Sequence, residues 1–466
     1  MGKHFPFVFQ NFKISYIGIF APHVWIYCVM HRVDIDYDGV ILGIPLYTAL
    51  SLGMLVVMMI TWRKPGMKMC RPIVWVLVAA MIGATVFLMY PFSFTNWIVV
   101  SVAAFISGLG VACLYLGWVP FYAALDIKNA IASIFAAMAV GSGIKILIDL
   151  MPALPAVICM SFLPVVSIAM SYQAQKHQPP LEVEPQIYHQ ESRSSVPWRI
   201  LLGVVVYSII IGMMQTISIE VAYTPYELLI IVHHGAEIIV ASVVLWWVFV
   251  RKGLLRFSSL WKAILLFTAT GLFFLPIIGV EWTGWALVLV AIAQTLIVML
   301  FWIMLADVAH HSALPPFVIF GSGWLAYSFS FAVGEIFGNV VASFGVSMYV
   351  ITLMTYFLTL AAVFALNENN LSQRRIFSDL EMVAPEESLY ANIDAGCVAI
   401  GKAHKLTKRE IEVLQLLCKG RSKAYIGEDL FISENTVRSH TKHIYEKLNV
   451  HSKQEILNMM TDSLQK

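Results

Sequence analysis

The chain has 466 residues, of which 59% are hydrophobic and only 12% are charged, and its formal net charge is +2. Charged residues make up about a quarter of an ordinary globular chain, so a soluble protein of this composition could not cover its surface. Together with a mean hydropathy of +0.78, these values exclude an ordinary soluble protein and place most of the chain in lipid.

The apolar residues gather into runs of about 20 residues, the length that crosses a bilayer. Twelve runs are expected to be membrane helices: 14–30, 39–61, 72–91, 97–122, 128–149, 151–171, 200–219, 227–250, 261–280, 284–307, 315–340 and 345–366. The first run lacks a clear small-residue cleavage site, so it is interpreted as a retained span. The six cysteines are scattered without short pairing, so neither a disulfide framework nor a zinc site is indicated.

The loops between these runs fall alternately on the two sides of the membrane, and the basic residues lie almost entirely in the loops of one side. One set carries Lys3, Lys13, Arg63, Lys64, Lys68, Arg71, Lys128, Lys176, Arg193, Arg199, Arg251, Lys252, Arg256 and Lys262. The other set carries only Arg32, beside three aspartates. Because cytoplasmic loops are enriched in Lys and Arg, the pattern predicts that the N- and C-termini are both cytoplasmic.

The longest loop, 173–197, divides the predicted spans six and six. This layout, with the basic, glycine-containing segments Arg63–Gly66 and Arg251–Gly253 after spans two and eight, resembles the major facilitator superfamily. The acidic residue that the family carries in its first loop is missing here. The resemblance covers about residues 10–366 and implies two six-helix halves around a central seam, lined by spans two, five, eight and eleven.

Ionisable residues inside membrane spans are costly and often mark a site. Lys145, Glu237 with His233 and His234, and Glu335 lie on spans five, eight and eleven, and His23 and Gln294 are weaker candidates. One hypothesis is that Lys145, His233, Glu237 and Glu335 line an outward-facing pocket for a small polar effector. The alternative is a structural ion pair without a ligand, between Lys145 and either Asp149 or Glu237.

A second polar group lies at the cytoplasmic end of span ten, where Asp307, His310 and His311 follow one another closely. These residues could form a pH-sensitive or metal-binding cluster. A solvated loop turn is the alternative interpretation.

The composition changes abruptly after Leu366, and residues 367–403 read as a polar cytoplasmic linker. Thr407 and Glu410 then form the pattern of a capping box ahead of an apolar run, so a helix is expected to begin there and to end at Gly420. Ser422 can cap a second helix, Ser433 or Glu434 a third helix to about Leu448, and a fourth begins near Ser452.

Two short helices joined by a tight turn are typical of a helix-turn-helix. On the third helix Val437, Ile444 and Leu448 share an inward face. The spacing places Arg438, Thr441, Lys442 and Tyr445 on an outward face that suits a DNA major groove, where Arg and Lys donate to guanine. A merely solvated basic face is the alternative.

The segment Leu406-Thr407-x-Arg409-Glu410-x-Glu412-Val413-Leu414, with Gly420-x-Ser422, Ile432-Ser433, Thr436-Val437-Arg438 and Lys447-Leu448-x-Val450, closely resembles the LuxR-type DNA-binding domain over residues 404–460. The resemblance implies base contacts from Arg438, Ser439 and Lys442, and backbone contacts from Thr436 and Lys447. His440 is expected to pack inward. In the family the last helix often mediates dimerisation, and here it could equally cover the core of the domain.

The expected fold is all-α: a polytopic membrane bundle in 1–366, the linker, and a small four-helix LuxR-type domain in 404–466. This organisation predicts a membrane-bound transcription regulator that senses a small molecule and binds DNA. It is expected to be dimeric at least on DNA, with RNA polymerase as a candidate partner. The alternative is a transceptor, which transports a solute and also regulates genes. We find no phosphate-cradling loop, nucleophile elbow or metal motif, so neither an enzyme nor a cofactor is expected. DNA must reach the membrane, which suggests the cytoplasmic (inner) membrane of a bacterium.

Overall fold

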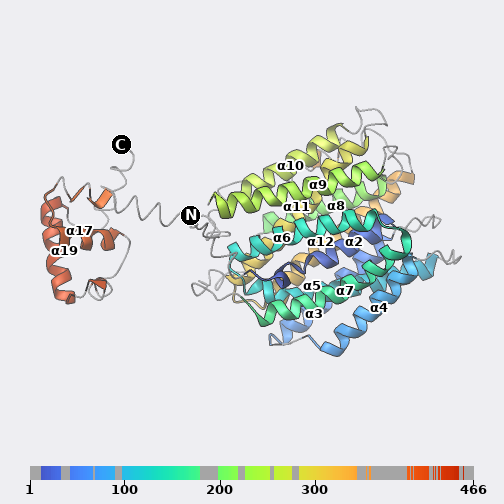
Figure 1. Ribbon diagram of the computed structural model, residues 1–466, viewed down its shortest axis with the longest axis horizontal. Coiled ribbons are helices and arrows are strands. Elements are labelled where there is room, and N and C mark those ends of the chain that lie inside the picture. Colours follow the sequence, from blue (N-terminus) through green and yellow to red (C-terminus); the bar gives the residue numbers. More distant parts are fainter. Residues whose placement is uncertain are drawn as a thin grey trace. The chain divides into compact units, whose positions relative to one another are not determined.

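The computed structural model describes residues 12–32, 42–66, 69–89, 97–178, 198–218, 226–251, 257–274, 283–343, 404–418 and 432–450, with single positions between 353 and 455 (353, 356, 357, 396–398, 400, 401, 423, 426, 429, 430 and 455). The chain divides into two compact units, Met1–Leu380 and Glu381–Lys466 (Figure 1). The predicted domain limits at 366 and 403 lie outside the described residues and stay predictions.

The first unit is a bundle of long apolar helices, preceded by a 3-10 turn at Ile14–Ile17. They are α2 (Phe20–Arg32), α3 (Gly43–Arg63), α4 (Arg71–Met89), α5 (Trp97–Ala123), α6 (Ile127–Asp149), α7 (Ala153–Lys176), α8 (Trp198–Ser218), α9 (Tyr226–Leu245), α10 (Phe257–Phe274), α11 (Thr283–His310) and α12 (Pro316–Ser343). Over the residues described, nine helical stretches are long and apolar enough to cross a membrane, which confirms the predicted polytopic bundle. The twelfth predicted span, 345–366, falls outside them.

The outer surface of the first unit is apolar while polar groups lie inside. Trp62, Val76, Phe162, Ile239 and Leu266 are each more than half exposed, whereas Ser107, Thr268 and Ser328 are fully buried. A soluble protein would not leave such large side chains in water, but hydrocarbon accommodates them. Several of the buried hydroxyls donate to the preceding helical turn, as Ser208 does to the Val204 carbonyl at 2.7 Å.

Close helix packing joins the bundle, and small residues make it possible. Helix α6 packs against α9, and α3 packs against α12, so both contacts cross from the α2–α7 half to the α8–α12 half. Within the second half, α8 meets α12 at Gly212 and Gly334. A Cβ at Gly334 would collide with the carbonyl of Ile209, and one at Gly212 with the carbonyl of Phe331. The two backbones therefore approach as closely as in other membrane helix pairs built on small residues.

The second unit contains α17 (Lys408–Cys418) and α19 (Glu434–Leu448). The capping box predicted for α17 is present: the Thr407 amide donates to Glu410 at 2.7 Å, and the Glu410 amide donates to the Thr407 hydroxyl at 3.2 Å. Ser433 caps α19 by accepting from the Thr436 amide at 3.1 Å. The helix ends at Asn449, which has a left-handed φ of 53°.

A small apolar core holds these helices together. It contains Val413, Leu414, Leu417, Ile426, Val437, Ile444 and Leu448, all buried. The inward face predicted for the third helix is therefore confirmed. Of the predicted second helix, the structure describes Lys423, Ile426 and Asp429, each in helical conformation, and of the predicted fourth only Glu455.

Candidate effector cavity and nucleic-acid interface

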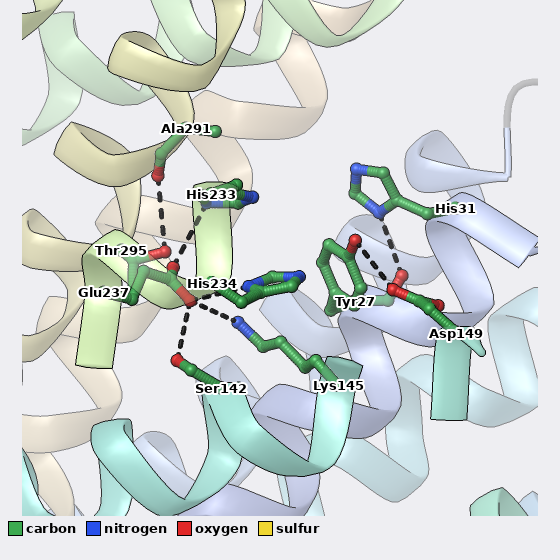
Figure 2. Close-up of polar contacts among 10 residues, drawn as sticks. All are labelled: Tyr27, His31, Ser142, Lys145, Asp149, His233, His234, Glu237, Ala291 and Thr295. Atoms are coloured by element: carbon green, nitrogen blue, oxygen red, sulfur yellow. Dashed lines mark hydrogen bonds and ion pairs between the residues drawn. The ribbon is translucent and has the colours of Figure 1, made fainter. Parts of the chain in front are cut away.

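Four polar side chains from two helices converge on the carboxylate of Glu237 (Figure 2). Ser142 on α6 donates to Glu237 Oε2 at 2.7 Å, and His234 Nδ1 on α9 lies 2.8 Å from the same oxygen. His233 Nε2 is 3.3 Å from Oε1, and Lys145 Nζ is 3.5 Å from Oε2. Because α6 and α9 belong to different halves of the bundle, this cluster ties the two halves together.

A cavity of about 160 Å³ lies beside this cluster, and both halves of the bundle line it. Its walls include Tyr27, Tyr47, Tyr115, Trp324, Tyr327 and Phe331, with the polar residues His23, His31, Lys145, Gln215, His233, Gln294 and Thr295. All of these rings except Tyr27 form a continuous series of ring contacts, with the centroids of Tyr115 and Trp324 4.5 Å apart and those of Trp324 and Tyr327 5.3 Å apart. The cavity is smaller than the roughly 300–1,000 Å³ of sites for drug-sized ligands.

Lys145 connects the cavity to the carboxylate behind it. Its ammonium lines the cavity, lies 4.9 Å from the centroid of the Tyr27 ring, and reaches Glu237 on its other side. Asp149, one turn further along α6, accepts a hydrogen bond from the Tyr27 hydroxyl at 3.1 Å. Of the two ion pairs considered from the sequence, the structure therefore contains the one between Lys145 and Glu237.

Glu335 lies apart from the other three predicted effector residues. Its side chain is fully buried but is not among those lining the cavity. It packs instead against α3, where a Cβ at Gly43 would collide with its carboxylate. The structure thus brings together Lys145, His233 and Glu237, and places Glu335 in the contact between α3 and α12.

The polar group at the end of α11 is buried, which contradicts a solvated loop turn. Asp307 and His311 are each only 4% exposed, and His311 Nε2 lies 3.9 Å from Asp307 Oδ1. His310 Nδ1 lies 3.3 Å from the carbonyl oxygen of Ala123 at the end of α5. The helix continues to His310 instead of ending before these residues, so their side chains pack against the bundle.

His233, His234 and Glu237 also have the chemistry of a metal site, because one ligand atom from each lies within 4.8 Å of the others. The Lys145 ammonium, 3.5 Å from the same carboxylate, would stand beside any bound cation. As the side chains are arranged, Ser142, His234 and Lys145 all approach Oε2 of Glu237, and Oε1 faces His233 at 3.3 Å.

In the second unit, the exposed face of α19 carries the predicted base-contact residues. Arg438, Ser439 and Lys442 are all exposed, as is Thr436 in the first turn. Arg438 and Lys442 border a groove with Lys423 and Tyr445. Each cation has a glutamate one turn away: Arg438 lies 2.8 Å from Glu434, and Lys442 lies 4.0 Å from Glu446. Such exposed pairs are worth less than about 1 kcal/mol and can exchange for phosphate or base contacts.

The structure places one residue of α19, Thr441, differently from the sequence prediction, and it gives Lys447 a partner within the domain. Thr441 was expected on the outward face but is 5% exposed, and its hydroxyl donates to the Val437 carbonyl at 2.8 Å. Lys447, predicted to contact the DNA backbone, has its ammonium 2.7 Å from Glu410 Oε2. His440, expected to pack inward, is half-buried.

The Glu410 contacts link α17 to α19. Burial by itself raises the pKa of Glu410, but hydrogen bonds from Lys447 and from Thr407 outweigh it and bring the pKa to about 2. Arg409 pairs with Glu412 on α17 itself at 2.6 Å, and its guanidinium donates to the carbonyl of Leu430, which precedes α19 in the chain. The helix that would enter DNA is thus held in a fixed orientation on its neighbour.

Comparisons with known proteins identify this domain. Residues 404–460 match the family of bacterial regulatory proteins, luxR family. The chain is 52% identical over 50 residues to the transcriptional regulatory protein DegU of Brevibacillus brevis, and 48% identical over 52 residues to the oxygen regulatory protein NreC of Staphylococcus carnosus. These matches cover 11% of this chain and 21% and 24% of the two relatives, so the chain spans only about a fifth to a quarter of their length. Residues 404–460 therefore form a LuxR-family helix-turn-helix domain.

The human organic anion transporter MFSD10 (TETRAN) has a crystal structure that covers 77% of this chain and all of its own, with a TM-score of 0.44 and 12% identity.

Proposed function

We propose that the protein is a membrane-bound one-component transcription regulator. The membrane unit senses a small molecule, and the LuxR-family domain on the same chain binds DNA. The observation that supports this proposal is the pairing, in one chain, of an exposed basic α19 with a membrane bundle that encloses a cavity between its halves.

On the DNA side, α19 enters the major groove and three residues read base edges. Arg438 and Lys442 leave their glutamate partners to donate to guanine, and Ser439 lies between them on the exposed face. Thr436 contacts the backbone near the start of the helix. Lys447 reaches a phosphate with its remaining N–H groups while keeping its bond to Glu410, because an ammonium has three donors.

On the membrane side, effector binding in the cavity favours one arrangement of the two halves over the other. A ligand shifts such an equilibrium only by its difference in affinity for the two arrangements, and a cavity lined by both halves supplies that difference. The protein acts as a dimer on DNA, in a bacterial cytoplasmic membrane with both termini cytoplasmic, and influences transcription by RNA polymerase. It has no enzymatic activity and uses no cofactor.

The same cavity favours a second candidate, the transceptor, because transport also requires a site between two halves. The two functions separate in proteoliposomes that contain the purified chain. A compound that binds the protein and also accumulates inside the vesicles would favour the transceptor, whereas binding without accumulation favours a sensor alone.

The decisive experiment compares the transcripts of cells that express the wild type, an Arg438→Ala/Lys442→Ala variant, or a Lys408→Ala control, at matched membrane abundance. Lys408 is an exposed lysine at the start of α17 and is not among the residues that line the groove beside Arg438 and Lys442. We expect a small set of genes to change in the double variant, because two contacts worth about 1–3 kcal/mol each are lost, and to stay unchanged in the control. Identical profiles for all three proteins under several growth conditions would contradict the proposal.

A further inference from the structure

The charges around the cavity are unevenly distributed, and this asymmetry bears on what it can hold. Among the described residues that line it, Lys145 is the only cation apart from histidines, and none is an aspartate or glutamate. The two nearby carboxylates are occupied: Asp149 accepts from Tyr27, and Glu237 lies behind Lys145. A ligand in the cavity therefore meets the Lys145 ammonium, while the described residues that line the cavity with it include no aspartate or glutamate.

Glu237 does not depend on Lys145 alone. Ser142 and His234 lie 2.7 and 2.8 Å from its carboxylate, whereas the ammonium is farther away, at 3.5 Å (Figure 2). If Lys145 turned into the cavity, the carboxylate would keep these closer donors and would not be left bare. Of these partners Lys145 is the one farthest from the carboxylate, and it also lines the cavity, so its ammonium can serve either Glu237 or a ligand.

The other side chains that line the cavity indicate what the uncharged part of the ligand is. Tyr27, Tyr47, Tyr115, Trp324, Tyr327 and Phe331 surround the cavity with ring faces and edges, which favour a planar apolar body. At about 160 Å³ the space suits a single ring and not a drug-sized molecule. Gln215, Gln294 and Thr295 supply further polar atoms for a substituent on that ring.

We infer that the cavity binds a small arylcarboxylate, whose carboxylate pairs with Lys145 and whose ring lies among the aromatic side chains. The inference rests on the proposed sensing function and specifies its effector class. Binding draws the Lys145 ammonium on α6 away from Glu237 on α9, and so loosens a contact between the two halves of the bundle. The occupied cavity thereby favours a different arrangement of the halves from the empty one.

The test measures thermal unfolding of the full chain in lipid nanodiscs, dialysed against EDTA, during titration with benzoate or phenylacetate. The matched neutral compounds are benzamide and phenylacetamide, which have nearly the same shape without the charge. A ligand that binds only the folded protein raises its Tm in proportion to ln(1 + [L]/Kd), so the titration gives an apparent Kd. We expect at least one acid to bind about tenfold or more tighter than its amide, since a hydrogen bond to a charged group contributes about 1.5–3 kcal/mol.

Variants assign this preference to Lys145. Lys145→Gln should abolish the preference for the acid, Lys145→Arg should retain it, and Lys128→Gln, at the other end of α6 and outside the cavity, should not alter it. If Lys145→Gln fails to fold, Lys145→Gln/Glu237→Gln replaces it, because the double variant leaves no buried carboxylate without its cation. Acids that bind no better than their amides, or a preference that survives loss of the Lys145 charge, would overturn the inference. Neither result affects the DNA-binding test, and unchanged transcripts with intact acid binding would reject only the regulator.

Discussion

At the scale of single residues, Glu237 shows which part of a buried polar cluster a sequence reveals. Ionisable residues stand out in apolar runs, so the sequence predicts Lys145, His233 and Glu237 as candidates, and an ion pair between Lys145 and Glu237 is one of its two structural alternatives. Ser142 could not be found, because a serine in a membrane helix usually donates to its own helix. Ser51 and Ser161 do so, bonding to the carbonyls four residues earlier at 2.7 and 2.8 Å.

Thr441 shows the opposite error, a residue assigned to the wrong face of its helix. It follows Val437 by four residues and precedes Ile444 by three, so it belongs to the buried stripe as much as to the exposed one. The hydroxyl resolves the ambiguity by donating to the Val437 carbonyl, which lets the side chain be buried without an unpaired donor. Spacing alone does not settle residues at the edge of an amphipathic face.

The Glu410 cluster leads to a prediction about pH. Glu410→Gln removes the ion pair with Lys447 and weakens the cap on Thr407, and should destabilise the LuxR-family domain by about 1–2 kcal/mol at pH 7. The folded pKa of Glu410, about 2, lies below its ordinary value of 4.5, so the carboxylate stabilises the domain above pH 4.5 and this contribution is lost as pH falls towards 2.

Hydrogen exchange of segment 404–418 in the full chain measures this effect. Faster exchange in Glu410→Gln than in the wild type is expected at pH 7, with a difference that persists to about pH 4.5 and shrinks below it. Glu412→Gln serves as the control, because Glu412 lies on the same helix but is about half exposed and pairs with Arg409 of that helix. Equal protection in wild type and Glu410→Gln at pH 7 would show that the bond to Lys447 contributes nothing.

At the scale of helices, the sequence predicts where the membrane helices lie better than it predicts which helices pack against each other. Apolar runs of the right length located the helices from α2 to α12, because the length that crosses lipid is a property of each segment alone. Which helix packs on which depends on shape at contact points, such as Gly212 against Phe331, and these carry no periodic signal. The seam contacts of α6 with α9 and of α3 with α12 agree with the layout that the family resemblance implied. That layout did not predict that Glu335 lies in the contact between α3 and α12 and outside the cavity.

The contact between α8 and α12 supports a second prediction. Gly334→Leu places a branched side chain against the Ile209 carbonyl, and the helices must separate to admit it. Overpacking of this kind costs about 1–3 kcal/mol or more, so we expect a lower Tm of the membrane unit and less protein in the membrane. The measurement is thermal unfolding in nanodiscs, together with membrane abundance by immunoblot.

Gly235 on α9 provides the matched control, because a Cβ there would meet nothing within 4 Å. Gly235→Ala should leave the Tm unchanged or raise it slightly, since Ala has the higher helix propensity by about 1 kcal/mol. A Gly334→Leu protein as stable as Gly235→Ala would mean that α8 and α12 are not in close contact at this point.

At the scale of the whole molecule, the two units call for different kinds of reasoning. The LuxR-family domain is recognisable because residues 404–460 match the family as a continuous segment, with 52% identity to one relative over 50 residues. The helical bundle of the membrane unit is specified mainly by hydrophobicity, a property that many sequences share. Information about its ligand therefore lies only in the side chains that the fold brings together. Lys145, Tyr27 and Trp324 come from α6, α2 and α12, and nothing in the chain order joins them.

The orientation of the molecule in the membrane can be tested with one of its own cysteines. Cys70 is exposed and lies in the basic segment between α3 and α4, which the distribution of Lys and Arg assigns to the cytoplasm. A membrane-impermeant maleimide should therefore label the protein strongly in inside-out vesicles and weakly in spheroplasts. The other five cysteines are buried or half-buried, and Cys70→Ser should remove most of the fast labelling. Strong labelling of Cys70 from outside intact spheroplasts would reverse the orientation. The predicted twelve spans put the segment of Cys70 and the C-terminal domain on the same side of the membrane. Labelling from outside would therefore also place α19 on the side without DNA, so a DNA-binding regulator requires that Cys70 be cytoplasmic.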